Sequence, residues 1–198
     1  RIELRDGETN LFDVLGIEDD INAALSRKVW LKSGAYLVID QTEALVSIDV
    51  NTGKNVGKAS LRKTIAETNC EAAVEIARQL RLRDLSGIII IDFIDMEEKE
   101  DKETVLATLR EALRGDRMRS VILGMTELGF VELTRKKLRA NLADTLQTTC
   151  PYCKGSGKVL NAETVALKIR SALIARVSEG AGAQQRFTVA ASPTVAAL

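Results

Sequence analysis

Residues 87–93 read Gly-Ile-Ile-Ile-Ile-Asp-Phe, an apolar run that predicts a buried strand. Consecutive β-branched residues favour a β-strand. An unbroken run of this kind is typical of a strand that is buried on both faces, as in parallel sheets. Asp92 then stands at the carboxyl end of a central strand, where a polar residue is unexpected unless it ends the strand or serves a site.

Strands and helices alternate on both sides of this stretch. The predicted strands are Ala35–Asp40, Ala44–Val50, Val121–Gly124 and Phe130–Leu133, and the predicted helices are Ile17–Ser26, Ser60–Leu82, Lys102–Arg114 and Ala162–Val177. The first two strands are joined by a short turn at Gln41–Glu43. The helix over 60–82 shows apolar residues at helical spacing. This order predicts an α/β or α+β core followed by a small tail.

The remaining segments are irregular. We expect a strand and loop in residues 1–16, with Arg1–Leu4 as the strand, and a basic, helical segment over Arg135–Leu146. Gly180–Gln185 reads as a linker, and residues 186–198 as a short strand with a stub. No apolar run is long enough to span a bilayer. Because the chain opens at Arg1 rather than Met, we expect it to be the middle of a longer protein.

The composition limits which catalytic and metal-binding groups the chain can use. The chain has no His, which excludes Ser-His-Asp and Cys-His catalysis and any zinc site built on imidazole. Hydrolysis would therefore depend on carboxylates, Lys or a metal ion. Lys plus Arg and Asp plus Glu number 28 each, so a global basic surface for nucleic acid is absent. Aromatic residues make up only 4%, so stacking platforms for single strands are scarce.

Two aspartates and an asparagine lie at predicted strand ends. In the strand ending near Asn51, alternation places Ser47, Asp49 and Asn51 on the polar face. If this strand neighbours the strand that ends at Asp92, both carboxylates converge at one edge of the sheet. Two carboxylates at this spacing repel unless a cation lies between them, and magnesium suits such an oxygen-only site.

Other aspartates offer the same local signal, since an Asp at a strand end is commonly a cap or a turn former. Asp40 ends its own strand beside a turn, and Asp95 would point to the other face if the last strand continued. We interpret both as structural.

The motif Cys150-Pro-Tyr-Cys153 has three readings. A redox motif should start a helix, but Lys-Gly-Ser-Gly follows and cannot. A zinc knuckle would have backbone N–H groups facing the thiolates, and because zinc needs four ligands a second copy of the chain would supply two more. The third reading is two idle thiols. Cys70 reads as a small core residue.

Two basic groups could hold phosphates, although a solvated face explains either one. One group directly follows the candidate site, where glycines allow close backbone approach. Its members are Lys54, Lys58, Arg62 and Lys63, and the other group is Arg135, Lys136, Lys137 and Arg139.

Together these features resemble the ribonuclease E/G family. The matching stretches run in order, with the family's spacing, over about residues 1–160. They are Ser33-Gly-Ala-Tyr-Leu-Val-Ile-Asp-Gln-Thr-Glu-Ala44, Ser47-Ile-Asp-Val-Asn-Thr-Gly53, Thr68-Asn69, Ile76-Ala-Arg-Gln-Leu-Arg-Leu-Arg83, Gly87-Ile-Ile-Ile-Ile-Asp-Phe-Ile-Asp-Met96 and Cys150-Pro-Tyr-Cys-Lys-Gly-Ser-Gly157.

The resemblance implies a cytoplasmic, magnesium-dependent endoribonuclease that cuts single-stranded RNA to leave 3′-hydroxyl and 5′-phosphate ends. Asp49 and Asp92 match its magnesium aspartates, and Asn51 an asparagine that orients the phosphate or the attacking water. Cys150 and Cys153 match cysteines that share zinc between two protomers, giving a homodimer or higher oligomer. RNA would be contacted by Lys54 and Lys58, and by Arg119, which matches an arginine that recognises the 5′ phosphate.

The resemblance also implies an architecture. Residues 1–24 would be the tail of a ribonuclease H-like subdomain, 25–146 a deoxyribonuclease I-like catalytic subdomain, 147–160 the zinc link and 161–198 the start of a small C-terminal α/β domain. The family's oligonucleotide-binding domain would precede this chain, so the isolated piece is expected to be barely active. The alternatives are a phosphodiesterase or phosphatase with another substrate, a non-catalytic zinc-linked module that presents RNA, and a thiol redox protein.

Overall fold

A computed structural model describes residues 10–53, 61–179 and 186–197. The chain divides into two compact units, Arg1–Gln147 and Thr148–Leu198, and each is described by itself. In the described residues, no helix is both long enough and apolar enough to cross a membrane. The strand expected at Arg1–Leu4 lies outside the described residues.

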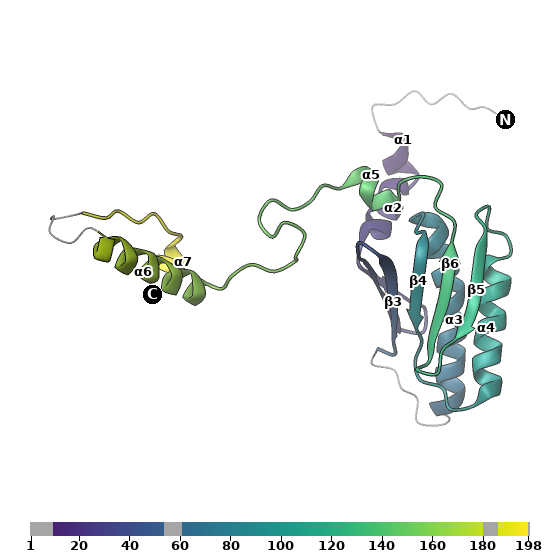
Figure 1. Ribbon diagram of the computed structural model, residues 1–198. Helices are drawn as coiled ribbons and strands as arrows, with labels where there is room; N and C mark the ends of the chain where they lie inside the picture. The colour runs from purple at the N-terminus through teal and green to yellow at the C-terminus, as the bar shows by residue number, and fades with distance from the viewer. Residues whose placement is uncertain (1–9, 54–60, 180–185, 198) are drawn as a thin grey trace. The chain divides into compact units, whose positions relative to one another are not determined.

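The first unit is built on a six-stranded sheet in the order β1-β2-β3-β4-β6-β5 (Figure 1). The strands are β1 Lys28–Trp30, β2 Tyr36–Gln41, β3 Leu45–Asn51, β4 Gly87–Asp92, β5 Ser120–Met125 and β6 Phe130–Arg135. Only β3 and β4 pair in parallel; every other neighbouring pair is antiparallel. The unit is therefore a mixed α/β fold, as the alternation of elements predicts, and β1 is an edge strand that the sequence pattern did not indicate.

The hairpin between β2 and β3 confirms the predicted turn. Thr42 N–H donates to the Leu45 carbonyl oxygen at 2.9 Å, and Leu45 N–H donates to Thr42 Oγ1 at 3.1 Å. This tight closure fixes the register, so Val38 lies opposite Asp49 and Tyr36 opposite Asn51.

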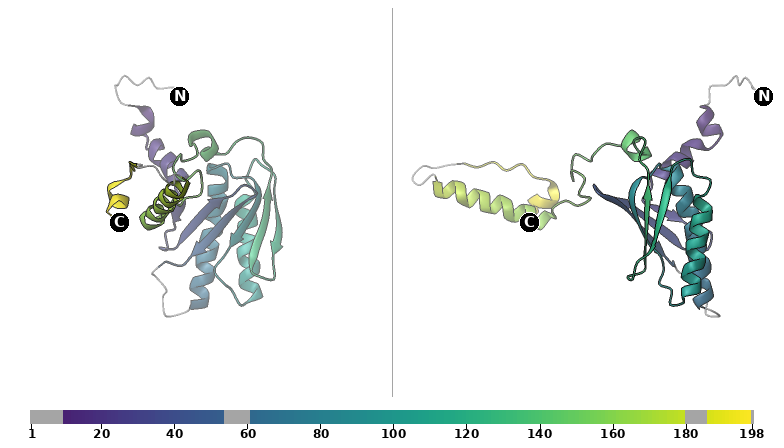
Figure 2. Two further views of the ribbon diagram at one scale, coloured as in Figure 1. Left: turned by 60° about the vertical axis from the view of Figure 1, so that its left-hand side comes forward. Right: turned by 45° about the vertical axis from the view of Figure 1, so that its right-hand side comes forward.

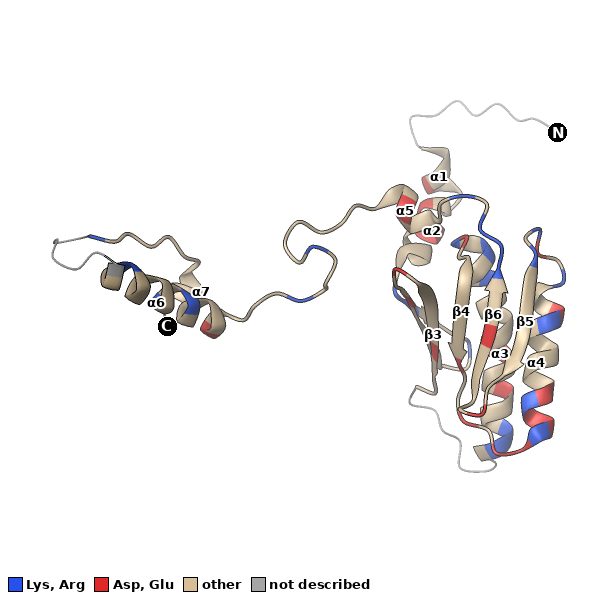
Figure 3. Cartoon of the chain, viewed as in Figure 1, with Lys and Arg blue, Asp and Glu red and all other residues tan. Residues whose placement is uncertain are grey.

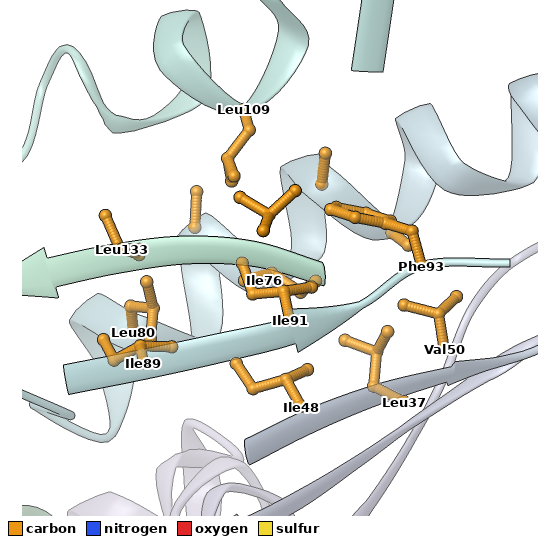
Figure 4. Packing of buried hydrophobic residues seen from close by; sticks show 14 of the residues in the cluster. Leu37, Ile48, Val50, Ile76, Leu80, Ile89, Ile91, Phe93, Leu109 and Leu133 are labelled. Atoms are coloured by element: carbon orange, nitrogen blue, oxygen red, sulfur yellow. The ribbon is translucent and has the colours of Figure 1, made fainter. Parts of the chain in front are cut away.

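Two long helices, α3 (Leu61–Leu82) and α4 (Lys99–Leu113), cover the same face of the sheet (Figure 2). Their apolar residues meet the inward side chains of the strands in one core (Figure 4). Fully buried members include Ile48, Ile76, Leu80, Ile89, Ile91, Leu109 and Leu133. Helix α4 begins three residues before its predicted start, and the acidic residues Glu100 and Asp101 in its first turn interact favourably with the helix dipole.

The other face of the sheet is not covered by any helix of the described part of the first unit. Ile89 and Ile91 are fully buried, but Ile88 is 52% exposed and Ile90 only half-buried. The expectation that this strand is buried on both faces is therefore wrong for this unit. The reason is that α3 and α4 both lie on one side, so alternate residues of β4 remain open.

The first unit also contains shorter helices outside the two-helix layer. They are α1 Leu11–Val14, α2 Ile17–Leu25 and α5 Leu142–Leu146. Helix α1 replaces part of the loop expected up to residue 16, and its N-cap Asn10 accepts a hydrogen bond from Phe12 N–H. The basic segment is helical only at its end, because Arg135 belongs to β6 and Asn141 caps α5 through Asp144 N–H.

The second unit contains α6 (Ala162–Glu179) and α7 (Pro193–Ala196). The strand expected within 186–198 is wrong, since its described residues form an extended segment and a short helix that starts at Pro193. Proline is favoured in the first helical turn because its missing N–H is not needed there. The described part of this unit is thus helical, and the α/β character expected for it is not seen.

Candidate active site on the open face of the sheet

Asp49 and Asp92 are direct cross-strand neighbours in the parallel pair β3 and β4. Neighbouring strands lie about 4.8 Å apart, so the two carboxyl-bearing backbones are held at that spacing. Val50, Ile48 and Ile91 turn into the core, which leaves both carboxylates on the open face. Figure 3 shows acidic residues near the ends of β3 and β4 and in the segment that follows β4. The polar face predicted from sequence alternation is therefore present, and β3 and β4 are the neighbours that convergence of the two carboxylates requires.

Asn51 joins this pair from the end of β3. Its Nδ2 donates to Asp49 Oδ2 at 2.8 Å. This hydrogen bond restrains the Asp49 carboxylate and uses one of the two N–H groups of the amide. The structure thus brings together all three residues that the sequence placed at strand ends.

Charge repulsion is present at this edge. Desolvation raises the pKa of Asp92, and the negative charges of Asp49 and Asp95 raise it further. The raised pKa means that the site disfavours the charged form of Asp92, through desolvation first and repulsion second. A cation bound between the carboxylates would relieve this cost, which is the electrostatic behaviour expected of a metal-binding pair.

Asp95 differs from the expectation that it is merely structural, whereas Asp40 agrees with that expectation. Strand β4 ends at Asp92, so Asp95 is not fixed on the opposite face, and it lies near enough to act on Asp92 electrostatically. Asp40 is held in an ion pair, with Arg27 Nε donating to its Oδ1 at 2.5 Å. That ion pair lowers the pKa of Asp40 and makes it the less suitable metal ligand.

A buried asparagine on α3 positions the segment after β4, and sequence reasoning assigned it no role. Asn69 donates from Nδ2 to the Ile94 carbonyl oxygen at 2.8 Å and accepts from Ile94 N–H at 3.0 Å. The signal was available, because Asn69 stands on the same helical face as Ala72, Ala73 and Ile76. An amide in an apolar stripe has to find partners when it is buried.

The loop after Asn51 depends on a close backbone approach. Gly53 has a φ of +63°, and a Cβ at this position would lie 2.2 Å from the carbonyl oxygen of Gly34. Only glycine fits here without displacing one of the two segments. Lys54 and Lys58, predicted to contact RNA, lie just beyond and outside the described residues.

Arg119 lies at the other end of the sheet from Asp92. Arg119 immediately precedes β5. The first residue of β5, Ser120, pairs with Arg135 of β6, and Arg135 also pairs with Gly87 at the start of β4. The length of β4 then separates Arg119 from the carboxylates by more than about 15 Å. Arg119 shares a hollow of about 510 Å³ with Arg110 and Arg114, so it belongs to a separate cationic surface.

The basic group that starts at Arg135 is partly structural. The Arg135 side chain is 2% exposed and makes ion pairs with Asp84 at 3.0 Å and with Asp116 at 2.7 Å. The expectation that Arg135 could hold phosphate near the metal is wrong, because two carboxylates occupy its guanidinium at the far end of the sheet. Arg62, in the other group, is also paired, with Asp101 at 2.7 Å.

The second unit carries the cysteine motif in a tight turn. Backbone N–H groups of Cys153 and Tyr152 face the Cys150 sulfur, and these contacts, with the Cys153 thiol, lower the pKa of Cys150. A lowered pKa suits a metal ligand and also a redox thiol. No helix starts at Cys153, since the chain turns at Lys154 with a φ of +50° and α6 begins only at Ala162. This geometry favours the knuckle over the redox motif.

Neither candidate metal site is complete in the described residues of one chain. They contain no cluster of three or more His, Cys, Asp or Glu side chains placed to hold a metal. Two carboxylates suit magnesium, which retains water ligands, whereas two thiolates fall short of the four that structural zinc needs. Cys70 packs against the core of the first unit, as expected.

The sequence matches proteins of known families over most of its length. The profile of the Ribonuclease E/G family matches residues 1–138. Ribonuclease G of Salmonella typhimurium is 48% identical over 196 residues, which is 99% of this chain and 40% of that protein. Ribonuclease E of Nostoc sp. is 48% identical over 147 residues, which is 74% of this chain and 21% of that protein.

These relatives are longer than the chain. Ribonuclease G of Haemophilus influenzae is 48% identical over 98% of this chain, and the match covers 39% of that protein. The chain therefore spans about two fifths of the length of the curated ribonuclease G relatives it matches.

Proposed function

The chain belongs to the ribonuclease E/G family, and from this premise we propose that it forms the catalytic part of a magnesium-dependent endoribonuclease acting on single-stranded RNA in RNA processing and decay. The observation that carries the proposal is the direct pairing of Asp49 with Asp92 across parallel strands on an open face. A phosphodiester can reach this face from solvent.

Each residue of the site has a separate task. Asp49 and Asp92 would supply the anionic oxygens that hold magnesium, and desolvation together with the negative charges of Asp49 and Asp95 raises the pKa of Asp92. When bound, magnesium lowers the pKa of a water ligand and offsets the charge growing on the phosphate. Asn51 restrains Asp49 and offers its free N–H to the scissile phosphate or to the water.

The bond changes follow from hydrolysis. Water adds to phosphorus and loses a proton, while the bond from phosphorus to the 3′ oxygen breaks and that oxygen gains a proton. The products are a 3′-hydroxyl and a 5′-phosphate end. Because the chain has no His, no imidazole of this chain can carry these protons.

RNA contacts away from the carboxylates complete the proposal. Arg119 is suited to bind a terminal 5′ phosphate because it is exposed on a surface that also carries Arg110 and Arg114. Lys54 and Lys58 would follow the backbone beside the metal. The proposal includes a deoxyribonuclease I-like subdomain at residues 25–146, the tail of a ribonuclease H-like subdomain at residues 1–24, and a cytoplasmic location.

Cys150 and Cys153 are proposed to bind zinc together with the same pair of a second copy, linking a homodimer or higher oligomer. The support is the lowered pKa of Cys150, because thiolates are the zinc ligands, and the lack of two further ligands for the motif among the described residues of one chain. Residues 147–160 would form this link, and 161–198 a further small domain.

The test is cleavage of a single-stranded RNA by the full-length protein, with and without magnesium, beside a DNA of the same sequence. Asp49→Asn and Asp92→Asn are each expected to lose at least about 100-fold in rate. Asp40→Asn is the matched control, since Asp40 lies on the neighbouring strand but is paired with Arg27.

Three outcomes would overturn parts of the proposal. Parental rates in both Asp49→Asn and Asp92→Asn would remove the metal assignment. Equal cleavage of DNA and RNA would indicate a phosphodiesterase with another substrate. Tight RNA binding without cleavage by the parental protein would indicate a module that only presents RNA.

A further inference from the structure

Two aromatic side chains lie on the open face of the sheet beside the carboxylate pair. Trp30 of β1 and Tyr36 of β2 are direct cross-strand neighbours, with ring centroids 5.2 Å apart and an interplanar angle of 59°. The Lys28 ammonium lies over both rings, 3.4 Å from the Tyr36 centroid and 4.0 Å from the Trp30 centroid. Composition alone suggested few stacking platforms, yet the sheet gathers two here.

These residues border a hollow of about 620 Å³ that reaches the candidate active site. Its wall also includes Asn51, whose amide holds the Asp49 carboxylate. Gly34 and Gly53 form the floor where their backbones approach closely. A ligand in this hollow would therefore touch the aromatic pair at one end and the catalytic asparagine at the other.

The position of the hollow follows from the strand register. Trp30, Tyr36 and Asn51 form one cross-strand row over β1, β2 and β3. The next row carries Lys28, Asp49 and Asp92. Two strand spacings, about 10 Å, separate Trp30 from Asn51. This is within reach of a nucleotide next to the phosphate held by Asp49 and Asp92.

We propose that Trp30 and Tyr36 form a stacking site for an RNA base beside the cleaved phosphate, with Lys28 placed to contact the backbone of the same nucleotide. The inference rests on the proposed function, since it names where the substrate lies. Aromatic faces next to a cation are the usual means of holding single strands, because every base has a π-face and every nucleotide a phosphate.

The exposure of Trp30 favours this reading over a structural role. Its side chain is 64% exposed, so the ring contributes little to the core of the first unit. An exposed indole at a strand edge has no folding requirement, whereas a base could cover it. Because the ring pair is not specific for one base, the site would strengthen binding more than it would select sequence.

Trp30 is the one Trp of this chain, and the difference in fluorescence between full-length proteins with Trp30 and with Trp30→Phe reports on its site. The test uses full-length protein carrying Asp49→Asn, titrated with a single-stranded RNA oligonucleotide, with the same oligonucleotide made abasic, and with inorganic polyphosphate. We expect strong quenching by the RNA and little by the other two. Equal quenching by polyphosphate or by the abasic strand would overturn the site, because it would show an anion site rather than a base site.

Cleavage kinetics supply the second measurement, made with Asp49 intact. Trp30→Ala is expected to raise KM about 10-fold with little change in kcat, and Trp30→Phe to restore most of the affinity. Leu123→Ala is the control, since Leu123 is 65% exposed on β5, the opposite edge strand. An unchanged KM in Trp30→Ala, with the fold verified by circular dichroism, would contradict the inference.

The two measurements separate this inference from the proposed function. Quenching that requires bases, without any RNA cleavage, would keep the stacking site and remove the catalytic proposal. Cleavage with an unchanged KM in Trp30→Ala would keep the catalytic proposal and remove the stacking site.

Discussion

Asn69 makes two hydrogen bonds with the backbone of Ile94, donating to its carbonyl oxygen and accepting from its N–H. Asn69 is fully buried on α3, and Ile94 lies two residues beyond Asp92, where β4 has ended. The helical layer thereby fixes the path of the chain as it leaves the carboxylate edge. The placement of Asp92 and Asp95 thus depends on a residue on the opposite side of the sheet.

Replacing Asn69 by Ala is expected to lower the free energy of unfolding by about 1–3 kcal/mol, because the N–H and C=O of the partly buried Ile94 would lose their partners. Magnesium-dependent cleavage should fall as well, with a larger magnesium requirement. Chemical denaturation and metal titration of cleavage measure the two effects. Asn22→Ala, on the exposed side of α2, serves as control and should change stability by less than about 0.5 kcal/mol.

The raised pKa of Asp92 predicts a pH-dependent magnesium requirement. As the pH falls, protons compete for Asp92 at a higher pH than for an ordinary aspartate, so the magnesium concentration for half-maximal cleavage should rise. In Asp49→Asn the pKa of Asp92 should fall, because a negative neighbour has been removed. Direct titration of the Asp92 carboxyl by NMR in both proteins checks this, and an unchanged pKa would contradict it.

The raised pKa of Asp92 also makes the stability of the fold depend on pH. A raised carboxyl pKa favours the protonated form in the folded state, so this contribution is present at acidic pH and lost as the pH rises through the folded-state pKa. At neutral pH, Asp92→Asn should therefore be as stable as the parental protein, or more stable by about 0.5 kcal/mol, while cleavage is lost. Thermal denaturation measures this; a clear fall in stability would count against repulsion at the site.

Arg135 and its two carboxylates are expected to control acid stability. Burial alone would raise the pKa of Asp84 and of Asp116, but hydrogen bonds and charges from arginines outweigh it and lower both. Carboxylates with lowered pKa stabilise the fold above their unfolded pKa, and this contribution is lost as the pH falls below about 4. Arg135→Met should cost about 3 kcal/mol and flatten the acid dependence of the denaturation midpoint.

Arg139→Ala is the matched control for Arg135. Arg139 also donates to Asp84, but its side chain is 75% exposed. Exposed ion pairs contribute about 1 kcal/mol or less. If Arg139→Ala and Arg135→Met lowered stability equally, the buried pairing would not be the source of the effect.

Gly53→Ala tests the close approach beside the candidate site. The added Cβ would lie 2.2 Å from the Gly34 carbonyl oxygen, so the loop after Asn51 has to move. We expect a loss of about 2 kcal/mol or more and weaker cleavage. Gly16→Ala provides the control, because Gly16 has a similar φ of +68° with open space around it and should show only the backbone strain of about 1 kcal/mol.

The zinc link predicts one zinc ion per two chains. Chelation, or Cys150→Ser, should release zinc and dissociate the dimer, and zinc should also be lost at acidic pH because the thiolates take up protons. Cys70→Ser should retain both zinc and the dimer, since Cys70 packs against the core. Metal analysis with light scattering measures both quantities. A dimer that persists without any zinc would refute the link.

Most of the local structure of the first unit could be predicted from the sequence, although β1 and α1 could not. Alternation placed Asp49 and Asn51 on the polar side of β3, and the isoleucine run identified β4, because strand periodicity is set by the backbone of each segment. Helical spacing likewise identified α3 and α4 to within a few residues. The family was also recognisable from motifs that retain their order and spacing.

Which of these residues come into contact depends on how the strands and helices pack. The register of β3 against β4 brings Asp49 beside Asp92, and Asn69 reaches Ile94 from 25 residues away. The same holds for Trp30 beside Tyr36, for the open face of β4, and for Arg135 buried between Asp84 and Asp116. Such contacts depend on strand order and on which face the helices cover, and these are properties of the whole packed unit that no local pattern contains.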